Sequence, residues 1–163
     1  MSDRTKVVKL ALETVTVGAN LAVIAMVIYY WPLLPERIPV HFNYLGRVDG
    51  WGGKAMLIFI AATAGFVWFC LTMAKRSKSV NVPWKITEEN KAATLELAAE
   101  LFLCLKAEIA FMFCYLVQGI VNCALSKKSG LDPAFLPIFL ITVFGTIGVF
   151  YFRGWRKFMT IET

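Results

Sequence analysis

Long apolar runs alternate with short polar segments along this chain. Crossing a hydrocarbon core of about 30 Å takes about 20 helical residues, and four runs are long enough: Val7–Trp31, Ala55–Ala74, Leu101–Leu125 and Pro133–Phe152. Hydrophobic residues make up 58% of the sequence and the mean hydropathy is +0.64, which is more apolar surface than one small water-soluble core can bury. We therefore expect an all-α integral membrane protein whose single domain is a four-helix transmembrane bundle.

Lysine and arginine are unevenly distributed between the segments that connect these runs. The two chain ends and the connection 75–100 hold eleven of them, whereas the connections 32–54 and 126–133 hold five. Cytoplasmic segments of membrane proteins carry the excess of positive charge. We therefore expect a multi-pass protein with both termini and loop 75–100 in the cytoplasm, and with loop 32–54 outside. The net charge of +6 is therefore explained mainly by the membrane topology. No nucleic-acid partner is expected, because the sequence contains no soluble module with a basic face.

Local signals set the ends of the last two helices. Thr87 followed by Glu88 and Glu89 is typical of a helix start, with a hydroxyl cap and acids in the first turn. The apolar pattern continues from there to Leu125, which predicts a long third helix whose first turns lie in the cytoplasm. Asp132-Pro133 predicts the start of the fourth helix, since proline is favoured at the first helical position.

The outer connection, residues 32–54, has chemistry that a simple spacer would not need. It contains three prolines, four glycines and the only histidine of the chain. The segment Val40–Asn43 alternates apolar and polar residues as a short strand does, and Gly46 and Asp49-Gly50 are turn signals. We expect a folded cap over the bundle. Its candidate ligand-binding or loop-structuring residues are Glu36, His41, Asn43, Gly46, Asp49, Gly50, Trp51 and Lys54.

These polar groups could bind a lipid headgroup, a peptide or a cation, or their hydrogen bonds could simply hold the cap together. His41 with Glu36, Asn43 and Asp49 could supply metal ligands, but the spacing matches no established site, so no metal or cofactor is expected. The four cysteines form no CxxC pair. No catalytic residue is expected either, because the loop offers His41 no serine or cysteine to activate.

Polar side chains also recur inside the apolar runs. Glu13 and Asn20 lie seven residues apart in the first run, and Glu108, Tyr115 and Asn122 repeat this spacing in the third, with Gln118 beside them. We expect these two stripes to face each other. Lys106 lies only two positions from Glu108, so the two should point to nearly opposite faces and not pair. A salt bridge between Lys106 and Glu13 is the structural alternative to a functional role. Ionisable groups at membrane depth favour a functional hypothesis, and Glu108, the deepest acid, is a candidate for proton, ion or ligand handling.

A dense pattern runs through the outer loop: Leu34-Pro35-Glu36-Arg37-Ile38-Pro39, then His41-Phe42-Asn43, Gly46, Asp49-Gly50-Trp51-Gly52 and Lys54. With its flanking helices, this pattern resembles the N-terminal domain of SdpI-type bacterial immunity proteins, a domain of unknown function that also occurs alone in small bacterial and archaeal membrane proteins. The resemblance implies a polytopic protein of a prokaryotic plasma membrane. For SdpI-type proteins it implies protection against a secreted toxic peptide and, for some members, capture of a cytoplasmic repressor. Four spans are expected here, without the longer C-terminal region of full SdpI-type proteins, so the resemblance narrows the fold more than the function.

We therefore expect a non-enzymatic SdpI-like membrane protein that acts in immunity or sensing. It would recognise a secreted peptide or a lipid headgroup at the outer face, through the loop around His41, Asn43 and Asp49. One alternative is a small transporter, or a proton- or ion-coupled protein, that uses Glu108; four spans are few for this task, so a homo-oligomer would be needed. Others are a subunit of a membrane complex, and an outer-face enzyme in which His41 acts with an acid or a metal.

Overall fold

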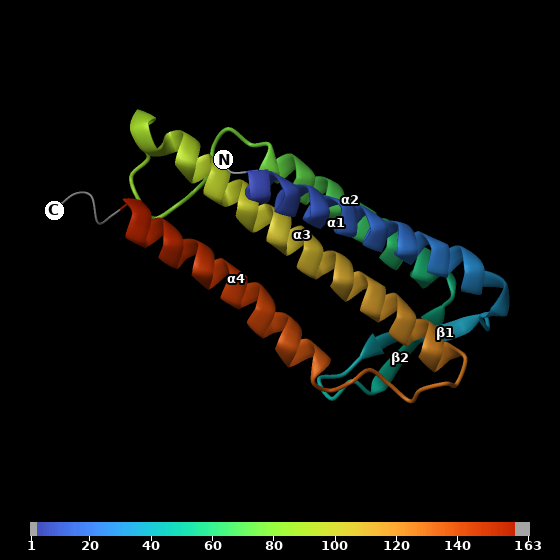
Figure 1. Ribbon diagram of the computed structural model, residues 1–163. Helices are drawn as coiled ribbons and strands as arrows, with labels where there is room; N and C mark the ends of the chain where they lie inside the picture. The colour runs from blue at the N-terminus through green and yellow to red at the C-terminus, as the bar shows by residue number, and fades with distance from the viewer. Residues whose placement is uncertain (1–2, 159–163) are drawn as a thin grey trace.

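The computed structural model describes residues 3–158, which form four α-helices, one short 3-10 helix and one β-hairpin. Consecutive helices run antiparallel, and the hairpin lies at one end of the bundle (Figure 1). The elements are α1 (Asp3–Tyr30), the 3-10 helix η1 (Trp31–Leu33), β1 (Arg37–Phe42), β2 (Val48–Gly53), α2 (Ala55–Lys75), α3 (Glu88–Ala124) and α4 (Phe135–Phe158). The start of α1 and the end of α4 lie at the end of the bundle opposite the hairpin.

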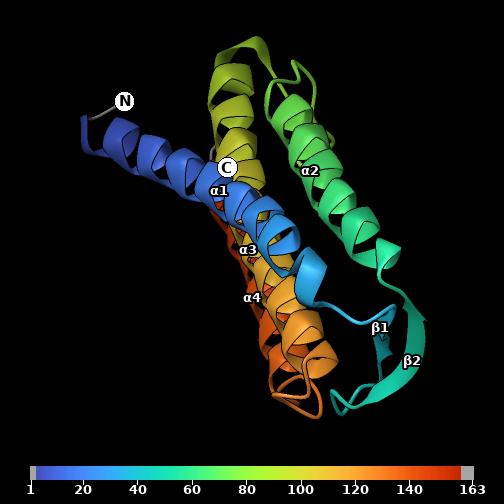
Figure 2. The same cartoon turned by 90° about the vertical axis from the view of Figure 1, so that its right-hand side faces the viewer.

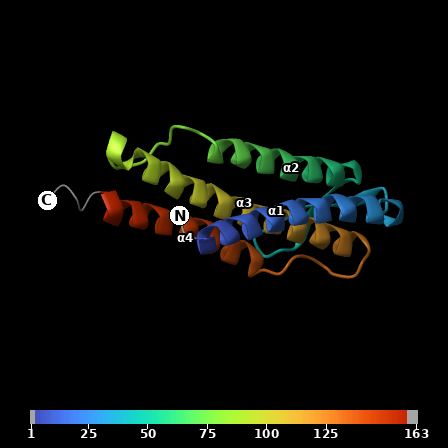
Figure 3. The same ribbon diagram turned by 45° about the horizontal axis from the view of Figure 1, so that its top comes forward.

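The central element is α3, which packs against each of the other helices. It lies between α1 and α2 on one side and α4 on the other (Figure 1, Figure 2). Most buried helical residues belong to α3, whereas α4 contributes only Phe150 and Gly154. The bundle is therefore built around one enclosed helix, with α4 held mainly along α3 (Figure 3).

Three segments among residues 3–158 are long and apolar enough to cross a membrane, judged by length and composition: Lys6–Leu33, Ala55–Lys75 and Phe135–Phe158. The helix α3, which contains the third of the four predicted spans, is not among them. Its polar residues lie along a helix that its neighbours cover, where other side chains can satisfy them. Hydropathy is a weaker guide for such an enclosed helix than for the outer three.

Both predicted helix starts are explained by capping. Thr87 Oγ1 accepts a hydrogen bond from the Asn90 backbone N–H at 3.3 Å, and Asn90 Oδ1 accepts one from the Thr87 N–H at 2.9 Å. This reciprocal capping box confirms that α3 begins at Glu88. Asp132 Oδ1 accepts from the Ala134 N–H at 2.9 Å, but α4 itself begins at Phe135, two residues later than predicted.

The outer loop departs from a purely α-helical fold. β1 and β2 form a two-stranded antiparallel sheet in which Pro39 pairs with Trp51 and His41 with Gly50. The strand-like segment that the sequence predicted, Val40–Asn43, overlaps the second half of β1, which begins earlier, at Arg37. Its partner β2 was not predicted. Alternating glycines in β2 obscure the period-two pattern by which a strand is recognised.

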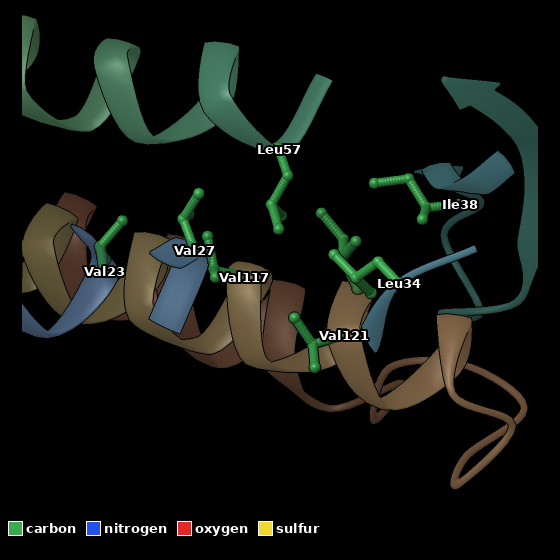
Figure 4. Close-up of a cluster of buried hydrophobic side chains, with 8 residues drawn as sticks. Val23, Val27, Leu34, Ile38, Leu57, Val117 and Val121 are labelled. Carbon is green, nitrogen blue, oxygen red and sulfur yellow. The ribbon is translucent and has the colours of Figure 1, made fainter. Parts of the chain in front are cut away.

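A cluster of buried apolar side chains fixes the hairpin to the helices (Figure 4). Ile38 on β1 is fully buried, and Leu34 lies beside it in the segment after η1. Both point toward side chains of α1, α2 and α3; the cluster comprises Val23, Val27, Leu34, Ile38, Leu57, Val117, Ile120 and Val121. Burying a large aliphatic side chain stabilises a protein by about 1.5–3 kcal/mol. The hairpin is thus an integral part of the core and holds a fixed position over the bundle.

Candidate functional site

Asn43 organises the turn of the hairpin. Its Oδ1 accepts hydrogen bonds from the backbone N–H groups of Leu45 at 2.9 Å and Arg47 at 3.0 Å. Its own N–H donates to the Arg47 carbonyl at 2.9 Å, and Gly46 occupies the left-handed region with φ +74°. Asn43 and Gly46 are therefore loop-structuring residues. The asparagine amide oxygen accepts the N–H groups of the turn, and glycine adopts the positive φ that the turn requires.

His41 and Asp49 face each other across the two strands. His41 Nδ1 lies 2.5 Å from Asp49 Oδ1, and because a carboxylate can only accept, the imidazole N–H donates. Gly50 pairs with His41, and a Cβ on Gly50 would lie 2.8 Å from the His41 Cβ, so this position must be glycine. Within residues 3–158, His41 Nε2 has no hydrogen-bond partner. The pair orients the ring and leaves Nε2 available to a ligand.

Glu36 and Lys54 close the base of the hairpin. Lys54 Nζ lies 2.8 Å from Glu36 Oε1 and 5.3 Å from the centre of the Trp31 ring, which is a cation–π contact. The Lys54 N–H also donates to the Glu36 carbonyl at 3.0 Å. Trp51 is 54% exposed on β2, as expected for an aromatic residue at the membrane interface.

The hairpin is tied to the connection between α3 and α4. The Leu131 N–H donates to the Gly46 carbonyl at 2.8 Å, and Arg47 and Gly130 form an isolated β-bridge. Gly119 on α3 makes room for the Leu131 side chain, because a Cβ there would lie 2.1 Å from Leu131 Cδ2. The two connections at this end therefore form one unit (residues 34–54 and 126–134), which we call the outer unit after the side of the membrane that the sequence predicts for it.

A cavity of about 250 Å³ lies between the hairpin and the start of α4. Its walls are mainly apolar and aromatic: Val40, Phe42, Tyr44, Leu116, Leu131, Pro133, Phe135 and Leu136. His41, Asn43 and Asp132 supply its polar edge, and no lysine or arginine of the described chain lines it. Three of the predicted site residues, His41, Asn43 and Gly46, thus line one cavity. The second loop that lines it was not connected to them by the sequence.

The predicted ion pair between Glu13 and Lys106 is present inside the helix bundle. Lys106 Nζ lies 2.7 Å from Glu13 Oε2, and Lys75 Nζ contacts Glu13 Oε1. The Lys106 side chain is 0% exposed, and its Nζ lies 4.7 Å from the centre of the Trp68 ring. One carboxylate thus joins α1, α2 and α3 around a buried cation.

The predicted meeting of two polar stripes is wrong. Glu108 and Tyr115 face α4: Thr146 donates to Glu108 Oε1 at 2.5 Å, and the Tyr115 ring stacks on Phe135 with 4.0 Å between ring centroids. Tyr115 Oη also accepts from the N–H of Asp132, just before α4, at 3.0 Å. Gln118 instead donates to Asn122 within α3 at 3.2 Å, and Asn20 donates to its own helix, at the Thr16 carbonyl. A seven-residue repeat identifies residues on one helix face, but it does not identify the helix that the face meets.

A second network joins α1, α3 and α4 at the end opposite the hairpin. Lys9 lies 3.1 Å from Glu96 and 3.4 Å from Glu100, and Arg153 lies 3.3 Å from the other Glu100 oxygen. The hydrogen bond from Lys9 lowers the pKa of Glu96 below its ordinary value. These pairs fasten α1 and α4 to α3 near water.

Several residues of the cavity and of the ion-pair network could not be recognised from the sequence. Lys75 was counted as a loop charge, and Trp68 and Leu131 are ordinary apolar residues until their contacts are seen. Thr146, a hydroxyl in the middle of the last apolar run, could have been singled out as a polar group in a span. Among residues 3–158, no group of three or more His, Cys, Asp or Glu side chains is placed to hold a metal ion.

Comparison with known families singles out the same region. Residues 19–65 match the family described as Domain of unknown function (DUF1648). The match covers the second half of α1, the hairpin and the first half of α2, and so includes every predicted site residue of the outer loop. It is consistent with the SdpI-type resemblance, and it leaves out Glu13, Lys106 and Glu108. No curated protein and no solved structure matches the chain.

Proposed function

We propose that this chain is a non-enzymatic, SdpI-like protein of a prokaryotic plasma membrane that recognises a membrane-active peptide at the outer face. The observation that carries the proposal is the cavity of the outer unit, whose walls are mainly apolar and aromatic and whose edge is polar. Immunity to the peptide, or sensing of it, is the role that fits such a site.

In the proposed topology, α3 is a fourth span enclosed by the other three, and both termini lie in the cytoplasm. The outer unit is then exposed at the external surface. The positive-inside distribution of lysine and arginine supports this orientation. Exposed Trp51 and Tyr29 near the hairpin end support a membrane–water interface at this level but not its side, because aromatic residues are enriched at both interfaces.

The size of the cavity indicates what it holds. Sites for whole drug-sized ligands measure about 300–1,000 Å³, so about 250 Å³ suits a single large side chain. A phosphate-bearing headgroup fits less well, because Asp132 is on the edge and no lysine or arginine of the described chain lines the walls. We therefore favour a peptide that inserts one apolar side chain, with His41 Nε2 available to its polar groups.

Two leucines on α4 provide a matched test. Leu136 lines the cavity and is 45% exposed, whereas Leu140, one turn further along the same helix, is 42% exposed and does not line it. Leu136→Trp should fill the cavity, and Leu140→Trp makes the same chemical change outside it. Cells that produce wild type, Leu136→Trp or Leu140→Trp at equal levels would be exposed to a panel of synthetic amphipathic leucine–lysine peptides, with membrane permeabilisation as the readout.

The proposal predicts that wild type and Leu140→Trp protect cells equally against at least one peptide of the panel, and that Leu136→Trp loses this protection. Equal permeabilisation with Leu136→Trp and wild type would contradict it. Protection that disappears only when the anionic lipid content of the membrane is changed would favour a lipid headgroup as the ligand.

A further inference from the structure

Glu108 lies at the contact between α3 and α4, deep in the helical part of the protein. Thr146 Oγ1 donates a hydrogen bond to Glu108 Oε1 at 2.5 Å. Thr146 is halfway along α4 (Phe135–Phe158), a helix long and apolar enough to cross a membrane. If α4 crosses the bilayer, as proposed above, this contact lies near the bilayer centre.

The second carboxyl oxygen of Glu108 has no partner. Glu108 Oε2 is buried without a hydrogen bond, and no other side-chain polar atom of the described residues is in this situation. Glu13 and Glu100 each lie within 3.4 Å of a lysine, whereas Glu108 forms no ion pair within residues 3–158. An ionised carboxylate with an unpartnered oxygen in this place is costly, and a bound proton removes the charge.

Thr146 also behaves differently from the other helical threonines. Hydroxyls of five others donate to a backbone carbonyl three or four residues earlier in their own helix: Thr14, Thr16, Thr63, Thr72 and Thr142. Thr94 on α3 accepts a hydrogen bond from Trp84 Nε1 at 3.3 Å. Thr146 instead donates across to α3. A hydroxyl can both donate and accept, so it can serve the carboxyl group in its charged and its protonated form.

A cavity of about 350 Å³ extends from this contact toward the end of the bundle opposite the hairpin. Thr146 and Cys104 line it, as do Glu100 and Arg153, which lie nearer that end. The charged and titratable groups around Glu108 are thus Cys104 and Glu100 on α3, Arg153 on α4 and Lys9 on α1, while Lys106 points away toward Glu13. Glu108 itself does not line this cavity, and its partner Thr146 is the residue through which the contact borders it.

We propose that Glu108 is a membrane-embedded proton-binding site, with Thr146 as its positioning residue. The carboxyl group is neutral when it binds one proton, and release of that proton leaves a carboxylate. This site is separate from the outer cavity and does not depend on peptide recognition.

Infrared spectroscopy of the whole protein in lipid bilayers tests this directly, because a protonated carboxyl group has its own carbonyl-stretching band. Glu108→Gln keeps the size and shape of the protonated side chain and should fold as wild type does, which a thermal melt checks. At neutral pH the wild-type spectrum should contain a band that Glu108→Gln lacks. That band should shift in D₂O and disappear reversibly at higher pH. Glu100→Gln, the matched control on the same helix, should retain it.

Absence of this band at neutral pH would overturn the proposal, since Glu108 would then be ionised. A band that neither shifts in D₂O nor responds to pH would overturn it too, because a sealed carboxyl group exchanges no proton. Thr146→Val removes a donor that favours the charged form, so the band should persist to higher pH than in wild type, while Thr146→Ser should titrate as wild type does. Identical titrations of Thr146→Val and wild type would overturn the role of Thr146.

Discussion

At the scale of single residues, Asn43 is held by the protein itself. Its amide oxygen accepts two backbone hydrogen bonds of the hairpin turn. The sequence singled out Asn43, His41 and Asp49 as one local group, and left open whether they bind a ligand or hold the loop together. The contacts assign Asn43 to the turn, whereas His41 Nε2 faces outward from its pair with Asp49.

Replacing Asn43 should loosen the turn while leaving the helices intact. Asn43→Ala removes the acceptor of the Leu45 and Arg47 N–H groups, at a cost of about 1–3 kcal/mol. Hydrogen exchange should show faster exchange at these two amides. Asn43→Asp retains an acceptor oxygen and is the control. Unchanged protection of both amides in Asn43→Ala would contradict this account of the turn.

Lys106 and Glu13 are a residue-level feature of a different kind. The sequence predicted their pairing as the structural alternative to a functional role for the polar groups at membrane depth. It could not reveal that Lys75 shares the same carboxylate, since the position of α2 depends on tertiary packing. Lys106 therefore has one carboxylate partner, whereas Glu13 has two lysine partners.

This asymmetry predicts unequal effects of two substitutions. Glu13→Gln leaves the fully buried Lys106 without a counter-charge and should destabilise the protein by about 3–5 kcal/mol. Lys106→Met leaves Glu13 paired with Lys75 and should cost less. Denaturant unfolding in detergent micelles measures both, and the double variant should recover part of the loss. If Lys106→Met lowers the free energy of unfolding as much as Glu13→Gln does, or more, then Glu13 is not what stabilises the buried Lys106.

At the scale of elements, helix positions follow closely from the sequence, because apolar runs, caps and prolines are local signals. Thr87 marked the start of α3 correctly for this reason. The strand β2 was missed because its glycines carry no side-chain pattern. The folding of the segment between α2 and α3 was not predicted either: Trp84 is buried there against Phe150 and Phe158 of α4.

Gly154 controls this contact between the segment and α4. A Cβ at Gly154 would lie 2.1 Å from Trp84 Cη2, so Gly154→Ala should displace the ring and expose residues 76–87. Gly148→Ala, in the same helix with no atom within 4 Å of the added Cβ, is the control. Limited proteolysis should cleave Gly154→Ala faster within residues 76–87. Equal cleavage of the two variants would mean that Trp84 does not fasten this segment.

At the scale of the whole molecule, the arrangement around α3 separates two regions. The hairpin and the connection between α3 and α4 lie at one end (Figure 1), and residues of both line the outer cavity. The Glu108–Thr146 contact instead joins α3 to the middle of α4. Sequence patterns predicted the helices and the importance of the outer loop. They could not predict that the loop shares a cavity with residues 131–136, because hydrogen bonds from a distant segment, such as that of Leu131 to Gly46, bring the two together.

The central claim is that the outer cavity binds one apolar side chain of a peptide. Its most direct test measures how tightly a fluorescently labelled leucine–lysine peptide binds at equilibrium to the purified protein in lipid nanodiscs. The peptide is one from the panel against which the wild-type protein protects cells. Losing one buried apolar side chain costs about 1.5–3 kcal/mol, so Leu136→Trp should weaken binding about tenfold or more, while Leu140→Trp should bind as wild type does. Equal affinities of Leu136→Trp and wild type would contradict the claim.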